Sequence, residues 1–153
     1  MKRASLCLIS LVFAVVVAIA LSAQSRPPSL NFSITLKRMG CLGTCPDYQV
    51  TILGDGSVQY EGHAYVRVEG VRKNSIPLED VNALIARLKR EHFFEWKKQE
   101  KVCVDLPEVH ITANLGSERN DVIEGCNSSG EVLALADEID RIARAKQWVG
   151  AHR

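Results

Sequence analysis

The stretch YQVTILGDGSVQYEG, residues 48–62, alternates apolar and polar side chains on both sides of a central Gly-Asp-Gly. A period of two residues is typical of a strand that buries one face. Glycine and aspartate accept the backbone angles of a tight hairpin turn. The stretch therefore predicts two antiparallel strands joined at Gly54-Asp55-Gly56.

Similar strand patterns lie on both sides of this hairpin. The two-residue period appears in NFSITLKR (31–38), HAYVRVEG (63–70) and VRKNSI (71–76). Four or five antiparallel strands are therefore expected in succession. A meander is the simplest topology for such a run.

A second β-hairpin is predicted farther along the chain. EVHITAN (108–114) and RNDVIEG (119–125) are strand-like, and the short LGSE joins them. This spacing places Asn114 opposite Arg119.

Two segments carry the 3.6-residue period of an amphipathic helix. In residues 77–96, acidic residues follow Pro77 in the first turn, and an aromatic group at the end is expected to pack into the core. In residues 128–149, Ser128 and Glu131 form a capping box. The predicted fold is α+β: a β-meander plus a β-hairpin in one sheet, with both helices packed on one face.

The N-terminus, MKRASLCLISLVFAVVVAIALSAQS, has the pattern of a secretory signal peptide. Two cations precede an apolar run of about 16 residues, which is shorter than the roughly 20 residues of a membrane-spanning helix. We expect a signal peptide at 1–23, a linker at 24–30 and one domain at 31–150. An uncleaved anchor is the alternative. After cleavage we expect no membrane association and a periplasmic or extracellular location.

The charge balance argues against nucleic acid as a partner. The chain has 19 Lys and Arg and 18 Asp and Glu residues, and Lys2 and Arg3 belong to the predicted signal peptide. The exported chain would therefore have a net charge of about −1, without the basic excess that polyanion binding requires.

Four cysteines remain in the predicted domain: Cys41, Cys45, Cys103 and Cys126. An even number in an exported chain indicates disulfide bonds, and four cysteines allow three pairings. The second hairpin puts Cys126 opposite about Pro107, where a bend would bring Cys103 near it. We expect Cys41–Cys45 and Cys103–Cys126 bonds. Zinc binding and a redox site are alternatives that the spacing fits less well.

Several motifs together resemble a known family. They are GCLGTCPDYQVTILGDGSVQYEG, IPLEDVNALIARL, FFEW, DLPEVHIT and the closing WVG. The chain resembles, over residues 33–150, functionally uncharacterised bacterial exported domains marked by a glycine-cysteine-x-glycine-x-cysteine-proline loop before a Gly-Asp-Gly hairpin. The resemblance implies a bacterial envelope origin and brings no activity.

No catalytic or metal-ligating constellation and no cofactor motif is recognised in the sequence. The first hypothesis is a non-catalytic module that binds an envelope protein, peptide or glycan near Leu42, Asp47 and Tyr48. Leu42 would either pack into the core or be offered to a partner. The alternative is a thiol-dependent redox factor, or an enzyme whose site is assembled from residues far apart in sequence.

Overall fold

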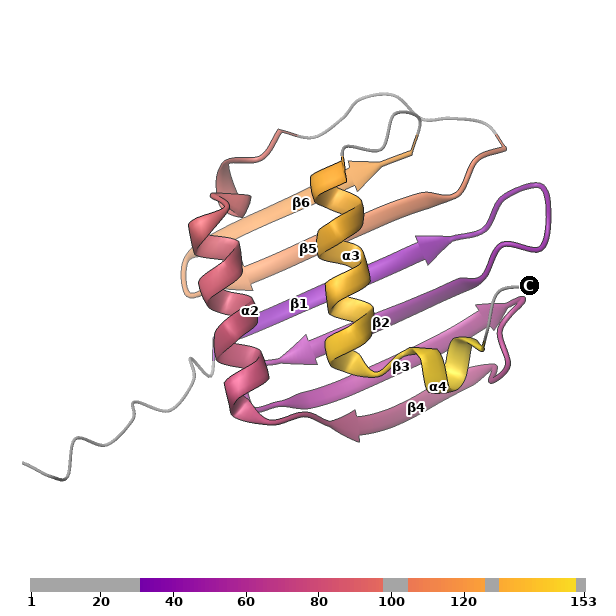
Figure 1. Cartoon of the computed structure of the whole chain (residues 1–153), viewed down its shortest axis with the longest axis horizontal. Coiled ribbons are helices and arrows are strands. Elements are labelled where there is room, and N and C mark those ends of the chain that lie inside the picture. Colours follow the sequence, from indigo (N-terminus) through magenta and orange to yellow (C-terminus); the bar gives the residue numbers. More distant parts are fainter. Residues whose placement is uncertain (1–30, 98–104, 126–129, 151–153) are drawn as a thin grey trace, which may run out of the picture.

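The computed structural model describes residues 31–97, 105–125 and 130–150. Within them, one antiparallel sheet has the strand order β4-β3-β2-β1-β5-β6 (Figure 1). Its strands are β1 (Phe32–Met39), β2 (Asp47–Leu53), β3 (Ser57–Ala64), β4 (Gly70–Ser75), β5 (Glu108–Leu115) and β6 (Glu118–Glu124). The meander and the second hairpin therefore join into one sheet through pairing of β1 with β5.

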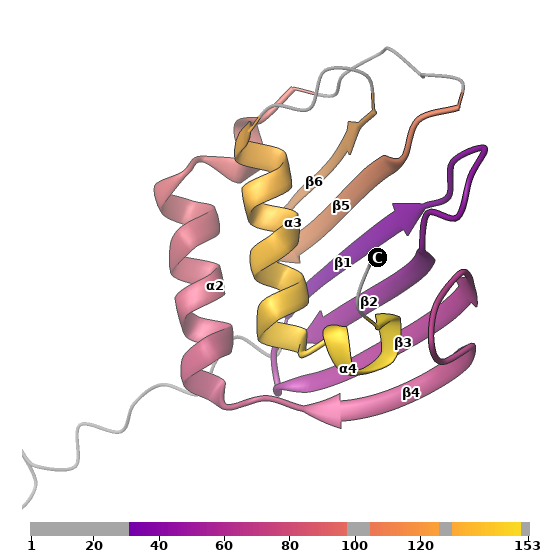
Figure 2. The ribbon, with the colours of Figure 1, turned by 45° about the vertical axis from the view of Figure 1, so that its right-hand side comes forward.

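Two long helices, α2 (Leu78–Arg90) and α3 (Gly130–Ala143), lie side by side on one face of the sheet (Figures 1 and 2). A short helix, η1 (Phe93–Glu95), follows α2, and another, α4 (Lys146–Val149), follows α3. None of the described helices covers the other face. The predicted α+β fold is confirmed.

The turn between β2 and β3 has the predicted chemistry. The Asp55 carboxylate accepts a hydrogen bond from the Ser57 backbone N–H over 2.8 Å. Gly56 has a φ of 84°, and a Cβ there would lie 2.5 Å from the carbonyl oxygen of Ile76. A side chain at position 56 would therefore be strained and would collide with the backbone. In the second hairpin, Asn114 pairs with Arg119 as predicted.

The core lies between the sheet and the helices. Alternate strand residues are buried there, and they pack against the apolar stripes of α2 and α3. Phe93 is fully buried, and Phe94 and Trp96 pack against the core, as the sequence predicted for this aromatic group. The Trp96 indole N–H donates to the carbonyl oxygen of Glu91 over 2.8 Å, which satisfies its polar atom.

Two details of the prediction were wrong. Of the predicted strand at 63–70, the first two residues end β3 and Gly70 begins β4, while the residues between them form bends. The predicted single C-terminal helix stops at Ala143, because Arg144 has a φ of 58°. This break lets Trp148 of α4 stack on Tyr60 of β3, with ring centroids 5.0 Å apart.

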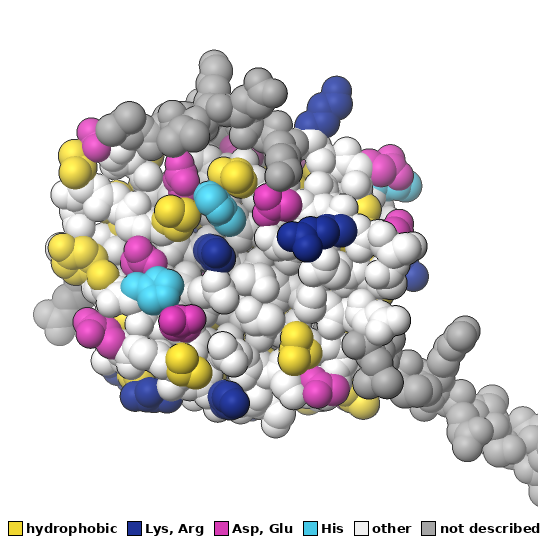
Figure 3. Space-filling view, turned by 180° about the vertical axis from the view of Figure 1, so that it is seen from behind, with side chains coloured by type: hydrophobic (Ala, Val, Ile, Leu, Met, Phe, Trp, Pro, Cys, Tyr) yellow, Lys and Arg dark blue, Asp and Glu magenta, His cyan; other side chains and the backbone are white. Residues whose placement is uncertain are grey.

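The uncovered face of the sheet is largely polar. Figure 3 shows mainly uncharged polar side chains and backbone on this face, with apolar, acidic, histidine and Lys or Arg side chains scattered among them. The Oγ1 atoms of Thr35 and Thr51, on neighbouring strands, are 3.0 Å apart. We call this surface the open face; an antiparallel sheet commonly leaves one side to solvent.

Candidate binding surface at the disulfide loop

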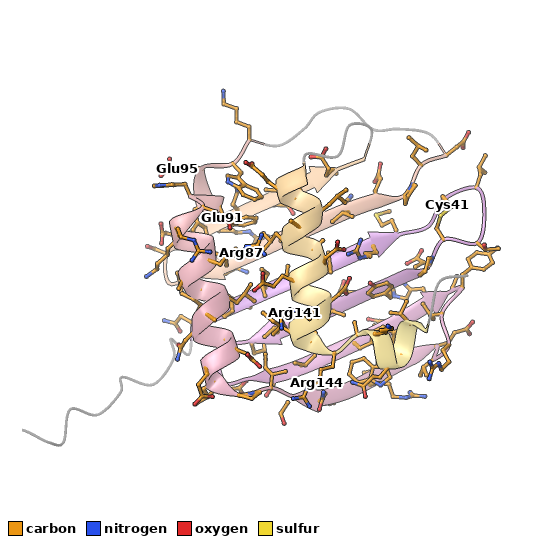
Figure 4. All side chains as sticks on the ribbon, viewed as in Figure 1. Cys41, Arg87, Glu91, Glu95, Arg141 and Arg144 are labelled. Atoms are coloured by element: carbon orange, nitrogen blue, oxygen red, sulfur yellow. A yellow bond between two sulfur atoms is a disulfide. The ribbon has the colours of Figure 1, made fainter. Side chains whose placement is uncertain are left out.

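Residues 40–46 form the loop between β1 and β2, and a disulfide bond cross-links it. The Cα atoms of Cys41 and Cys45 are 5.5 Å apart, and the Gly43 backbone N–H donates to Cys41 Sγ over 3.3 Å. Figure 4 shows Cys41 beyond the end of the sheet. The predicted Cys41–Cys45 bond is confirmed. Cys103 and Cys126 lie outside the described residues.

Leu42 lies inside the disulfide ring and points away from the core. Its side chain is 81% exposed, the largest value for a large hydrophobic residue in the described ranges. Of the two sequence-based alternatives, packing into the core is thus excluded. A small covalent ring limits the conformations of the loop, so this exposed apolar side chain is held in place.

A groove of about 320 Å³ lies beside Leu42. Its apolar lining includes Met39 at the end of β1 and Leu106 just before β5, which are 40% and 48% exposed. Gly40, Cys41, Asp105 and Glu108 complete the lining. Because Met39 is paired with Glu108 across β1 and β5, the two walls have a fixed spacing.

The groove also contains acidic groups. Asp105 and Glu108 contribute carboxylates, and no lysine or arginine stands among the described residues that line it. The Glu108 carboxylate is 3.2 Å from Nε2 of His110, and its side chain is only 15% exposed. The groove therefore combines apolar surface with negative charge.

Asp47 and Tyr48, the other predicted binding residues, lie on opposite faces because they are successive residues of β2. Asp47 belongs to the open face and its carboxylate is 2.8 Å from Nδ1 of His63. Tyr48 faces the helices and is 3% exposed. The structure therefore does not bring Leu42, Asp47 and Tyr48 together in one site.

Tyr48 instead belongs to a charged network beneath α3. Its hydroxyl donates to Oδ2 of Asp140 over 2.8 Å. Arg38 Nε donates to the same oxygen over 2.8 Å, and its NH2 group donates to Asp137 over 2.7 Å. We call Arg38, Tyr48, Asp137 and Asp140 the buried network, although the Asp137 side chain at its edge is exposed. It joins β1 and β2 to α3.

Burial changes the protonation of this network. Burial raises the pKa of Asp140, and the interactions with Arg38 and Tyr48 offset only part of that effect. Burial and the nearby Asp140 charge raise the pKa of Tyr48, so its hydroxyl keeps the proton that it donates. For Arg38, burial lowers the pKa, but the two aspartates outweigh it and the net shift is upward.

A hollow of about 450 Å³ adjoins the buried network, with Lys146 of α4 on its wall. Its charged groups are balanced, since Arg38 and Lys146 stand against Asp137 and Asp140. Asp140 Oδ1 is buried and has no hydrogen-bond partner in the described part of the chain. The contacts of this network hold α3 against the sheet.

A second polar link joins the two helices. Arg87 of α2 donates to Glu91 on its own helix over 2.9 Å and contacts Glu138 of α3. Figure 4 shows Arg87 between α2 and α3. These groups hold the two helices together.

Within residues 31–97, 105–125 and 130–150, no three His, Cys, Asp or Glu side chains are grouped so that they could hold a metal ion. No helix in these ranges has the length and apolar character needed to cross a bilayer.

The sequence interpretation overlooked Arg38 and Asp140. The signal was present for Arg38, because the alternation of Phe32, Ile34 and Leu36 places residue 38 on the core face. Its partner could not be found in this way, since Asp140 follows 102 residues later and the sequence pattern does not set the register of α3 on the sheet.

Taken together, these features define a small α+β domain with one open sheet face and a disulfide-constrained loop at one end of the sheet. The sequence profile of a domain of unknown function, DUF6438, matches residues 32–143, and the chain belongs to this family. No curated protein matches the chain.

Proposed function

We propose that this protein is an exported, non-catalytic interaction module that binds a partner at the groove beside Leu42. The observation that carries the proposal is the 81% exposure of Leu42 on a disulfide-constrained loop. Exposed apolar side chains that adjoin one another mark interaction surfaces. A constrained loop also loses less entropy on binding than a mobile one.

Export is supported by the signal-peptide pattern before residue 24 and by the Cys41–Cys45 bond. Disulfides persist mainly in oxidising compartments. N-terminal sequencing of the native protein should give a start between Ser22 and Arg26, and an intact Met1 would contradict cleavage. Mass spectrometry of non-reduced peptides should also find Cys103 linked to Cys126.

Thiol–disulfide exchange is the second candidate, and one observation favours it. Cys41 lines the groove, and its sulfur accepts a hydrogen bond from Gly43, which would stabilise a thiolate. If this were the activity, the protein would accelerate the reduction of a disulfide substrate by an added dithiol, which first reduces Cys41–Cys45 and is itself oxidised to a disulfide, and Cys41→Ser would abolish this acceleration. The interaction module predicts no turnover above that of free dithiol.

Co-purification tests the proposed function. Affinity-tagged wild-type protein and the Leu42→Ser variant would be expressed in the native host and purified with their partners. Leu53→Ser is the matched control, because Leu53 is 42% exposed at the opposite end of β2. The partner should be lost with Leu42→Ser and kept with Leu53→Ser. Equal recovery with both variants would refute binding at this groove.

A further inference from the structure

We infer that the groove beside Leu42 receives a protein segment in which a large apolar side chain stands next to a lysine or arginine. This inference rests on the proposed function and narrows its partner to a polypeptide with a defined local chemistry.

The apolar part of the inference follows from where the exposed hydrophobic residues lie. The described ranges contain seven exposed large hydrophobic side chains: Met39, Leu42, Leu53, Tyr65, Val71, Leu78 and Leu106. Three of the seven, Met39, Leu42 and Leu106, line this one groove. Its volume of about 320 Å³ suits one or two inserted side chains.

The cationic part follows from the charges around the same groove. Asp105 and Glu108 are in its lining. Asp47 and Glu61 lie farther away on the open face of β2 and β3, where both contact His63, at 2.8 and 3.7 Å. Lys37, two residues before Met39 on β1, is a cation on that face. Among the described residues that line the groove, there are two carboxylates and no lysine or arginine, which favours a partner of positive charge.

The nearby arginine does not change this balance. Arg38 points to the helix face, where Asp137 and Asp140 engage its guanidinium at 2.7 and 2.8 Å. It is therefore neutralised on the other side of the sheet. His110 contacts Glu108 at 3.2 Å but carries a full positive charge only when protonated.

The two parts of the groove have a fixed geometry. Met39 and Glu108 are paired in register across β1 and β5, so an apolar side chain and a carboxylate stand directly opposite each other. The disulfide fixes the third wall at Cys41 and Leu42. A partner residue inserted between Met39 and Leu42 would thus bring its sequence neighbour close to a carboxylate.

Selection from a display library of random linear peptides tests this inference. The purified folded protein would be the bait, in parallel with Leu42→Ser, with Asp105→Asn/Glu108→Gln and with the charge control Glu95→Gln/Glu118→Gln. Glu95 and Glu118 are exposed and do not line the groove. Melting curves would verify that every bait is folded, and Asp105→Asn alone would replace the double variant if that one failed to fold.

Wild type and the charge control should enrich peptides with Leu, Ile, Phe or Met beside Lys or Arg. Leu42→Ser should enrich none of them. The carboxylate variant should retain the apolar residue and lose the basic one, and its affinity for a wild-type-selected peptide should fall about threefold to fivefold. Wild-type affinity should weaken in high salt, and the carboxylate variant should respond less.

Other outcomes separate this inference from the proposed function. If the peptides that depend on Leu42 carry no basic residue, the proposal of binding at the groove stands and the inference of a cationic partner is wrong. If no peptide is enriched while a glycan co-purifies with the wild type and not with Leu42→Ser, the proposed function stands and the inference of a polypeptide partner is wrong. If no peptide is enriched and no partner co-purifies through Leu42, both are wrong.

Discussion

The buried network and the groove beside Leu42 occupy the same end of the sheet and differ in every physical respect. In the network, Arg38 and Asp140 are largely buried and pair with each other between β1 and α3, while the Asp137 side chain is exposed. In the groove, apolar side chains are exposed and have no packing partner comparable to the core. Polar groups inside and apolar groups outside are the informative exceptions to ordinary burial.

This difference suggests separate roles for the two regions: the buried network stabilises the fold, and the groove is the proposed binding surface. A carboxylate that is removed from water needs a partner, so Arg38 and Tyr48 stabilise the Asp140 carboxylate in the folded protein. An exposed leucine contributes little to folding, so Leu42 is available for the partner contact that we propose. Substitutions in the network should therefore change stability, and substitutions in the groove should change binding.

The largest effect is expected for Arg38→Met. It leaves Asp140 buried without its cation, and breaking such a pair costs about 3–5 kcal/mol of unfolding free energy. Urea denaturation measures this change. Arg141→Met is the control: Arg141 is 69% exposed and pairs with Glu138 at 3.5 Å, so its loss should cost about 0–1 kcal/mol. Equal effects of the two changes would contradict the account of the network.

The stability deficit of Arg38→Met should depend on pH. The pKa of folded Asp140 lies above its ordinary value of 3.8, because burial disfavours the charge. At a pH between the pKa of Asp140 in the unfolded state and its higher pKa in the folded state, the folded protein binds more protons than the unfolded chain. The unfolding free energy therefore falls as the pH rises through this window. Removing Arg38 raises the folded pKa further and extends the window upward. The deficit should therefore shrink as the pH falls from neutrality through that window, whereas a constant deficit would argue against Asp140 as its source.

A smaller loss is expected for Tyr48→Phe. The ring is retained, but Asp140 loses the donated hydroxyl hydrogen bond, and a bond to a charged group is worth about 1.5–3 kcal/mol. Tyr65→Phe provides the comparison, since Tyr65 is 60% exposed, and should change stability by no more than about 0.5 kcal/mol. Thermal and urea unfolding of both variants measure these changes in unfolding free energy. A neutral Tyr48→Phe would mean that the hydroxyl is not needed.

The disulfide of the loop should contribute about 2 kcal/mol by the chain-entropy argument. Cys41→Ser/Cys45→Ser should lose roughly that amount and keep the circular dichroism spectrum of the fold. Because the loop then becomes flexible, partner binding should weaken even though Leu42 is unchanged. Full binding by this variant would show that loop rigidity is unimportant for recognition.

The smallest effect on stability is expected for Leu42→Ser. An exposed substitution of this kind usually changes unfolding free energy by no more than about 0.5 kcal/mol. Leu36, which is fully buried in β1, is the contrast: Leu36→Ala should cost about 2–5 kcal/mol. A large drop in the melting temperature of Leu42→Ser would assign the loop a structural role.

The sequence was sufficient for the architecture because the fold follows from local periods. The alternation around Gly54-Asp55-Gly56 and the two helical stripes specify strands, turns and helices without long-range information. The break at Arg144 was missed, since Arg144 has a positive φ although it is neither glycine nor proline, and the contact of Trp148 with Tyr60 that accompanies the break joins residues far apart in sequence.

The candidate site was only partly accessible from sequence. The spacing of Cys41 and Cys45 indicated a constrained loop, and Leu42 was recognised as the residue to examine. The contribution of Leu106 and Glu108 could not be predicted, because it depends on the pairing of β1 with β5. A two-residue period identifies strands but does not say which strand lies beside which.

Photo-crosslinking at position 42 in the native host tests the central claim most directly. A photo-reactive amino acid, p-benzoylphenylalanine, would replace Leu42 in one strain and Leu53, which is also exposed but lies at the opposite end of β2, in another. Illumination should give a discrete crosslinked product from position 42 and none of the same mass from position 53. A product from both positions, or from neither, would contradict the assignment of the disulfide loop as the binding surface.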